Sequence, residues 1–146
     1  WIYSAVRLRQ QPIKYAAIST WCMAGEDVTD LRRWHERGLL GRVDFFMGEI
    51  FRGSYPDVYA ATRQFIDECG GRLVIFRNHS KVMAIHGERF DCLIESSANV
   101  NTNPRSENTV LTVDRSLTAE YIQLFSEIIP FNKDCGAEPY QLPPQR

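Results

Sequence analysis

Two short polar pairs carry the side chains that could react with a substrate. His79 and Lys81 stand two residues apart, and so do Ser97 and Asn99 further along the chain. The residues around both pairs are apolar, which predicts strands. Because alternate side chains of a strand point to the same side, each pair is expected to share one face of a sheet. Two neighbouring strands would then bring four polar groups to one spot.

This set of side chains suits a phosphate. Lys81 and Asn99 donate hydrogen bonds, and Ser97 both donates and accepts, so together they can hold anionic oxygens. An imidazole such as that of His79 can attack as a nucleophile or move a proton near neutral pH. Glu107 could accept a hydrogen bond from one nitrogen of that ring and leave the other free to attack. We therefore predict a phosphoryl-transfer site that works without a metal.

The ordered combination resembles the signature of the phospholipase D superfamily. The family's His-x-Lys pair is matched by His79 and Lys81. Its Ser-x-Asn strand end is matched by Ser97 and Asn99, and Glu107 falls where the family has a supporting acid.

Two positions depart from the family pattern. His86 stands where the family has an Asp five residues after the lysine, and Glu95 stands where it has a Gly before the serines. The Asp is structural in the family, so its replacement removes no reacting group.

The resemblance implies a fold, an activity and a mechanism. The fold is α/β, with a mixed, mostly parallel β-sheet flanked by helices. The activity is that of a metal-independent phosphodiesterase, a nuclease first of all, in which His79 forms a covalent phosphohistidine intermediate. Lys81, Ser97 and Asn99 would hold the nonbridging oxygens, and Glu107 would align the imidazole. No cofactor is implied.

Such a mechanism needs a second histidine to protonate the leaving oxygen, whereas the chain has one His-x-Lys. Members of the family build the site from two copies. The resemblance therefore implies a homodimer with a shared active site, or a second half upstream of Trp1. The expected partner is nucleic acid, with DNA favoured over RNA. Arg77 and Arg105 are placed to hold flanking phosphates.

Two other functions stay open. A phospholipid hydrolase or transferase of the same superfamily is disfavoured, because no basic amphipathic helix or exposed aromatic hairpin predicts a membrane-facing surface. A noncatalytic phosphate or nucleic-acid binding module would fit His86 and Glu95 as signs of lost catalysis. A metal site is disfavoured because His79 and His86 are seven residues apart and would face opposite sides of one strand.

Composition restricts the partners and the compartment. The formal net charge of −1 gives no global attraction to a polyanion, so nucleic-acid binding would depend on a local patch. The four cysteines are scattered without zinc-site spacing. We expect a cytoplasmic protein with reduced thiols and no stable membrane association.

Strands and helices alternate in the first half of the chain, which is typical of a parallel α/β sheet. The predicted elements are strands over 15–21, 42–47 and 72–76 and helices over 31–37 and 56–69. The first helix would follow a turn over 25–27 and be capped by Thr29, and Ser54 would cap the second. Phe51 in the intervening loop either stacks on a base or covers the core.

The second half predicts a hairpin, a further strand and a final helix. The strands cover 81–86, 90–96 and 107–113, and the helix begins at Ser116 with Ile129 in its buried stripe. We predict one domain over 1–138 and an extended, proline-rich tail over 139–146. Residues 1–11 are predicted as a short strand or an arm.

Overall fold

The computed structural model describes residues 12–101 and 104–144. The prediction for residues 1–11 lies outside this part of the chain. Among the described residues, no helix is both long and apolar enough to cross a membrane. The four cysteines of the chain are free thiols.

The strands form one sheet with the order β3-β2-β1-β4-β5-β6. They are β1 (Ile13–Thr20), β2 (Leu40–Gly48), β3 (Arg72–Phe76), β4 (Val82–Gly87), β5 (Asp91–Ser96) and β6 (Thr109–Thr112). β1, β2 and β3 pair in parallel, whereas β4 pairs antiparallel with both β1 and β5, and β6 pairs antiparallel with β5. The predicted α/β fold with a mixed sheet is confirmed.

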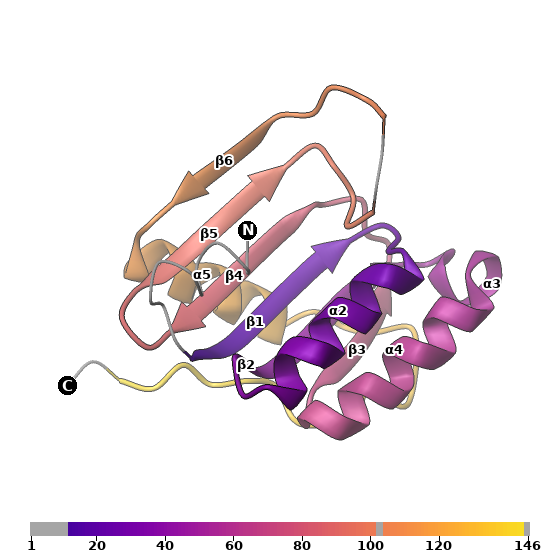
Figure 1. The fold of residues 1–146 in the computed structure, drawn as a ribbon, viewed down its shortest axis with the longest axis horizontal. Helices are drawn as coiled ribbons and strands as arrows, with labels where there is room; N and C mark the ends of the chain where they lie inside the picture. The colour runs from indigo at the N-terminus through magenta and orange to yellow at the C-terminus, as the bar shows by residue number, and fades with distance from the viewer. Residues whose placement is uncertain (1–11, 102–103, 145–146) are drawn as a thin grey trace.

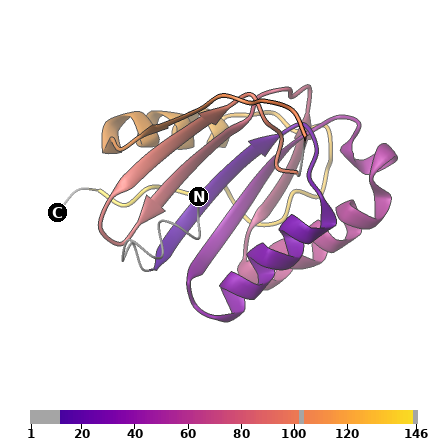
Figure 2. The same ribbon diagram turned by 45° about the horizontal axis from the view of Figure 1, so that its top comes forward.

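Helices cover both faces of this sheet (Figures 1 and 2). They are α2 (Gly25–Glu36), α3 (Phe51–Ser54), α4 (Pro56–Cys69) and α5 (Arg115–Ser126). Phe65 of α4 packs with Phe45 of β2 in one core cluster, and Phe125 of α5 stacks on Phe46 of β2 in the other. Neighbouring residues of β2 thus enter different cores. Strands buried on both faces read as continuous apolar runs, which is why they were predictable.

The beginning of α2 differs from the prediction. The segment expected as a turn, 25–27, forms the first turn of the helix instead. Glu26 and Asp27 lie there, where acidic side chains are favourable beside the positive end of the helix dipole. Thr29 is not the cap, because its hydroxyl donates to the carbonyl of Gly25 within the helix.

Two further boundaries need correction, and one is confirmed. Ser54 ends the short helix α3, and Tyr55 is the N-cap of α4. Pro56 is the first residue of α4, as predicted, and Gly70 ends it in the left-handed conformation with φ of 65°. Ile129 is 84% exposed and lies beyond the end of α5, so its predicted burial is wrong.

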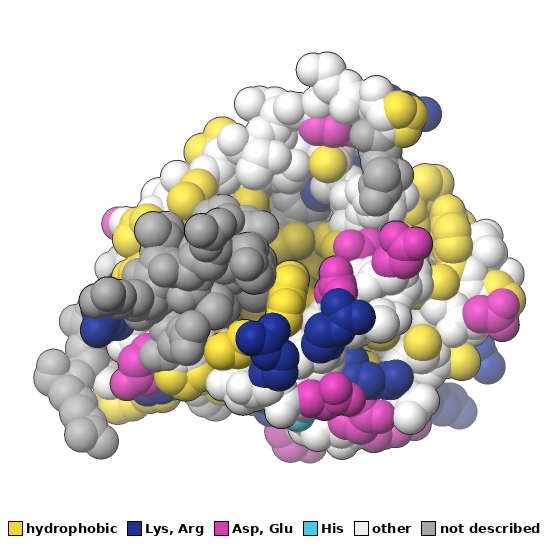
Figure 3. All heavy atoms as spheres, viewed as in Figure 1, with side chains coloured by type: hydrophobic (Ala, Val, Ile, Leu, Met, Phe, Trp, Pro, Cys, Tyr) yellow, Lys and Arg dark blue, Asp and Glu magenta, His cyan; other side chains and the backbone are white. Residues whose placement is uncertain are grey.

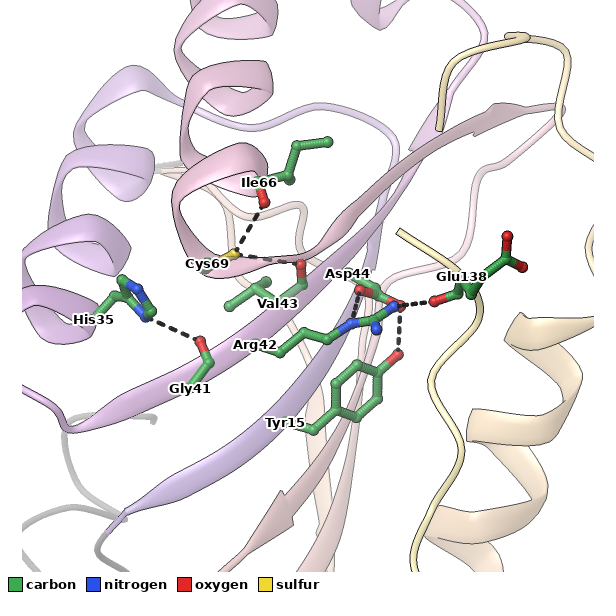
Figure 4. A network of polar contacts seen from close by, with 9 residues as sticks. All are labelled: Tyr15, His35, Gly41, Arg42, Val43, Asp44, Ile66, Cys69 and Glu138. Carbon is green, nitrogen blue, oxygen red and sulfur yellow. Dashed lines mark hydrogen bonds and ion pairs between the residues drawn. The ribbon is translucent and has the colours of Figure 1, made fainter. Parts of the chain in front are cut away.

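A buried carboxylate fastens the C-terminal segment to the sheet (Figure 4). Asp44 of β2 is fully buried and accepts hydrogen bonds from Arg42 Nε at 2.8 Å and from the Tyr15 hydroxyl at 3.1 Å. Burial raises the pKa of Tyr15, and the charge of Asp44 raises it further. Arg42 also donates to the carbonyl of Glu138, and the Tyr140 ring stacks on Tyr15 at 3.7 Å. Leu142 also packs on this side of the sheet, so the tail is held beyond Tyr140, and the domain boundary stays a prediction.

Removing the Asp44 carboxylate should destabilise the fold. In Asp44→Ala, the buried hydroxyl of Tyr15 and the guanidinium of Arg42 lose their acceptor, at a cost of about 3 kcal/mol. Urea unfolding followed by circular dichroism measures the change. Asp67→Ala is the control, because the Asp67 side chain is 67% exposed and should contribute less than about 0.5 kcal/mol. Equal losses in the two variants would contradict this account of the network.

Candidate active site

The predicted site residues lie near one edge of the sheet. Ser19 near the end of β1 pairs with Val82 at the start of β4, and Val82 pairs with Glu95 near the end of β5. Ser96 at the end of β5 pairs with Thr109 at the start of β6. The loop before β4, the loop after β5 and the segment after β1 therefore meet at the same edge, toward which the arrowheads of β1 and β5 point in Figure 1.

A buried carboxamide holds the loop before β4 in place. Asn78 is 4% exposed, and its Nδ2 donates to the carbonyl of Phe46 at 2.7 Å and to the hydroxyl of Ser19 at 3.0 Å. Its Oδ1 accepts from the backbone N–H of Ser80 at 2.9 Å and from the Ser80 hydroxyl at 2.7 Å. Asn78 thus ties the residues on either side of His79 to β1 and β2.

The hydroxyls of Ser19 and Ser80 complete a ring of hydrogen bonds. Their oxygens are 2.6 Å apart. Because the Ser80 proton is donated to Asn78, Ser19 must be the donor of this bond. Each group in the ring both donates and accepts, so the bonds polarise one another and reinforce the loop geometry.

His79 and Lys81 meet as predicted, although not for the predicted reason. Both precede β4, so they do not alternate along a strand. The Lys81 ammonium donates to the carbonyl of His79 at 2.6 Å and lies 3.3 Å from Nδ1 of its ring. The imidazole is exposed at the surface and its Nδ1 faces a cation.

The charge of Lys81 is easier to remove than that of a free lysine. Partial burial of the ammonium lowers the pKa of Lys81, and nearby Cys22 and Glu107 act in the opposite direction. A lysine in such surroundings gains most from an anionic group that completes its coordination.

Ser97 and Glu107 form a pair of their own. The hydroxyl of Ser97 donates to the carboxylate of Glu107 and accepts from the backbone N–H of Asn108 at 2.9 Å. The backbone N–H of Ser97 donates to the carbonyl of Asn108 at 3.0 Å. These contacts join the loop after β5 to the segment before β6. The predicted contact of Glu107 with the His79 imidazole stays a prediction.

The side-chain oxygen of Asn99 holds its carboxamide in place. Its Oδ1 accepts from the backbone N–H of Trp21 at 3.2 Å and lies 3.3 Å from the hydroxyl of Thr20. Val100 also donates its N–H to the Thr20 hydroxyl, at 3.1 Å. The amide oxygen is therefore turned toward the end of β1. Ser97 and Asn99 hold different partners instead of sharing a strand face.

Three other residues singled out from the sequence lie as follows. Arg77 is exposed beside Asn78, and Arg105 is exposed and makes interactions of its own. Phe51 is fully buried against the core, so a role in stacking on a base is wrong and its covering of the core is confirmed. The predicted contacts of Arg77 and Arg105 with phosphates stay predictions.

The other two histidines of the chain lie at the opposite edge. His86 near the end of β4 is buried, and its Nδ1 is 2.6 Å from Asp91. The Nδ1 of His35 is 2.8 Å from the carbonyl of Leu40 at the start of β2. His86 lies near the end of β4, and His35 lies in the last turn of α2 beside the start of β2. Because both places are remote from His79, neither histidine can share a phosphate with it within one chain.

Sequence reasoning missed Trp21. This half-buried residue follows β1, and its ring centroid is 5.5 Å from that of His79 at an angle of 54°. The available signal was its place at the end of the predicted strand 15–21, but its contact with His79 depends on the pairing of β1 with β4.

A cavity of about 290 Å³ adjoins the site on the face of the sheet that carries α2. Its floor is apolar, with Ile18, Met83 and Ile94, while Asn99 and Asp27 lie on its rim. Figure 3 shows hydrophobic side chains in this hollow and acidic side chains beside it. In residues 12–101 and 104–144, no cluster of three or more histidine, cysteine or acidic side chains could hold a metal ion.

The fold is similar to that of a known enzyme. A crystal structure of polyphosphate kinase from Porphyromonas gingivalis matches with a TM-score of 0.52 and 19% sequence identity. The match covers 85% of this chain and 20% of the kinase chain. At this identity the likeness is one of fold. No family model matches the chain, and no curated protein sequence matches it.

The ring of hydrogen bonds formed by Asn78, Ser19 and Ser80 should be essential for the stability of the fold as well as for the site. Asn78→Ala leaves buried acceptors and the loop N–H without partners, and we expect a loss of about 3 kcal/mol in the free energy of unfolding. Denaturant unfolding measures it. Arg77→Ala, one residue away and exposed, should change stability by less than about 0.5 kcal/mol. A mild effect of Asn78→Ala would mean that the loop is held by other contacts.

Proposed function

We propose that this protein is a metal-independent phosphodiesterase, first of all a nuclease, that uses His79 as a covalent nucleophile. One observation carries the proposal. The exposed imidazole of His79, the ammonium of Lys81 and the carboxamide of Asn99 all lie near one sheet edge, held there by the hydrogen bonds of Asn78 and by Trp21. Such donors around a nucleophile suit the developing charge of a phosphoryl-transfer transition state.

The fold likeness supports the general chemistry. Polyphosphate kinase is, by its name, an enzyme that transfers phosphoryl groups, and a part of its structure, 20% of the chain, shares the fold of this protein. Since a fold can host unrelated activities, the site itself must support the specific reaction. The ordered residues that resemble the phospholipase D superfamily do so.

In the first step, Nε2 of His79 attacks phosphorus and the bond to the leaving oxygen breaks. For this the ring proton must reside on Nδ1, which now faces the Lys81 ammonium at 3.3 Å. A bound phosphate would draw Lys81 toward its nonbridging oxygens and release Nδ1 to donate a hydrogen bond. Glu107, within the electrostatic reach of Lys81, is the proposed acceptor. Ser97 and Asn99 would assist in holding the phosphate.

The leaving oxygen must receive a proton, which a second imidazole would supply. In the second step, water attacks phosphorus, the bond from phosphorus to Nε2 breaks, and the second imidazole takes the proton from water. The chain has three histidines, and His35 and His86 are held at the opposite edge of the sheet. We therefore propose that His79 of a second subunit fills this role, in a homodimer with a shared site.

Nucleic acid is the proposed substrate, with DNA ahead of RNA. Arg77 and Arg105 are both exposed near this edge and would contact phosphates on either side of the scissile one. Such contacts position a strand without reading its sequence. The enzyme would use no cofactor and would act in the cytoplasm.

Cleavage should depend on His79 and withstand EDTA. His79→Asn removes the nucleophile, and we expect the rate to fall by at least about 10³-fold. His35→Asn is the matched control, because it replaces a histidine at the opposite edge and should leave the rate nearly unchanged. Gel assays of labelled oligonucleotides in excess EDTA measure both. Cleavage that needs a divalent metal, or that survives in His79→Asn, would contradict the mechanism.

The shared site can be tested by mixing. When wild-type and His79→Asn chains exchange subunits in equal amounts, about one quarter of the dimers carry two His79 residues. Activity per wild-type chain should then fall to about half. Independent, monomeric sites would show no such fall, and gel filtration would give the mass of one chain.

The lowered pKa of Lys81 predicts the alkaline limit of activity. The ammonium must be charged to hold phosphate oxygens, so activity falls as pH rises through its pKa, below the ordinary lysine value of about 10.4. Because Glu107 raises this pKa, Glu107→Gln should move the fall to lower pH. Residual rates between about pH 7 and 11 measure the shift. The exposed-carboxylate variant Asp67→Asn should leave the profile unchanged.

One observation favours a second candidate, a phospholipid hydrolase or transferase. The apolar cavity shares Asn99 with the site and has Asp27 on its rim, so it could take an apolar or cationic part of a lipid headgroup. Burial raises the pKa of Asp27, which makes the acid a weaker attraction for a cation. Hydrolysis of phospholipid vesicles without cleavage of oligonucleotides would favour this candidate over the nuclease.

A further inference from the structure

Trp21 is the aromatic side chain next to the proposed nucleophile. Its ring centroid is 5.5 Å from that of His79, and the two rings are tilted by 54°. The indole is half-buried, so part of its surface is open beside the imidazole. It is therefore within reach of whatever is attached to a phosphate held at His79.

The indole packs closely against Gly48. A Cβ at Gly48 would lie 2.4 Å from Cδ1 of Trp21 and 3.0 Å from the carbonyl of Asn78, so the ring occupies space that only glycine leaves open. The backbone N–H of Trp21 is bound by Oδ1 of Asn99 at 3.2 Å. Asn99 thus contacts the backbone of Trp21, and Asn78 donates to the carbonyl of Thr20 just before it. A rigid aromatic surface loses little entropy when a ligand stacks on it.

We propose that Trp21 is a stacking platform for an unpaired nucleobase beside the scissile phosphate, and that the enzyme selects single-stranded over double-stranded nucleic acid. This inference rests on the proposed nuclease function and adds the strand preference. A base in a duplex is paired and is stacked on its neighbours, so it cannot also cover an indole without being turned out. A base in a single strand can.

The charge of the protein agrees with this preference. A formal net charge of −1 provides little general attraction for the phosphates of a duplex. Stacking on an aromatic ring supplies affinity that tolerates any base and requires no basic groove. The cations near the site, such as Lys81, can hold the phosphate while Trp21 holds the adjoining base.

Binding and cleavage of one oligonucleotide, single-stranded or annealed to its complement, test the proposal. Binding is measured in the His79→Asn background, where turnover is absent, and cleavage in the background of the wild type. We expect the single strand to bind at least about tenfold more tightly. Trp21→Leu, which keeps an apolar side chain, should weaken this binding about tenfold and leave duplex binding unchanged, and Trp21→Phe should restore most of it.

Separate measurement of KM and kcat distinguishes stacking of a base on Trp21 from a role of Trp21 in positioning His79. Loss of a platform raises KM for the single strand, whereas a misplaced imidazole lowers kcat for every substrate, including a small phosphodiester without a base. An equal loss on single strand, duplex and small ester would overturn the platform. So would an unchanged Trp21→Leu enzyme whose cleavage still requires His79, and in that case the nuclease function would stand.

A fluorescence measurement tests the stacking without the Trp21→Leu variant. Stacking of a base on Trp21 should quench indole emission when the single strand is added to the His79→Asn protein, and Trp21→Phe should abolish this quenching although Trp1 and Trp34 remain. Quenching that persists in Trp21→Phe would overturn the proposal. If the wild type neither binds nor cleaves nucleic acid, the nuclease function fails, and the platform fails with it.

Discussion

The site depends on one buried carboxamide. Asn78 contributes no reacting group, yet its Nδ2 and Oδ1 connect the loop before β4 to the carbonyl of Phe46 and to Ser19. A polar group buried in this way is costly unless all its hydrogen bonds are made, so the loop has one arrangement that satisfies it. His79, between Asn78 and Ser80, inherits that arrangement. The exposed His79 is thus held by a network that is centred on a buried side chain.

Strand direction explains why distant segments supply this edge. β1 ends there because it runs parallel to β2 and β3, and β4 begins there because it runs antiparallel to β1. β5 runs antiparallel to β4, and β6 runs antiparallel to β5, so the loop between β5 and β6 lies at the same edge. Contacts of Thr20 and Trp21 with the segment around Asn99 then lock that loop to the end of β1. The edge is therefore a junction of three loops on a rigid sheet.

The sequence predicted the strands well because burial on both faces leaves long apolar runs. It predicted the start of α2 poorly, because the composition of residues 25–27 suits a loop turn as well as the acidic first turn of a helix. Phe51 could not be placed, because its burial depends on packing with α4. The meeting of His79 and Lys81 was predicted from strand alternation but arises from a loop. The roles of Asn78 and Trp21 depend on partners from β1 and β2, which no local pattern reveals.

The distribution of histidines links this geometry to assembly. His79 lies three residues before the start of β4 and His86 near its end, and the length of the strand keeps the two apart. A reaction that needs one neutral and one protonated imidazole therefore cannot be completed by His79 and His86 of one chain. Two copies related by a twofold axis would present two identical imidazoles, and only the direction in which a substrate lies between them would decide which attacks and which donates its proton. Under the proposed mechanism, symmetry of the protein and asymmetry of the substrate together assign the two roles.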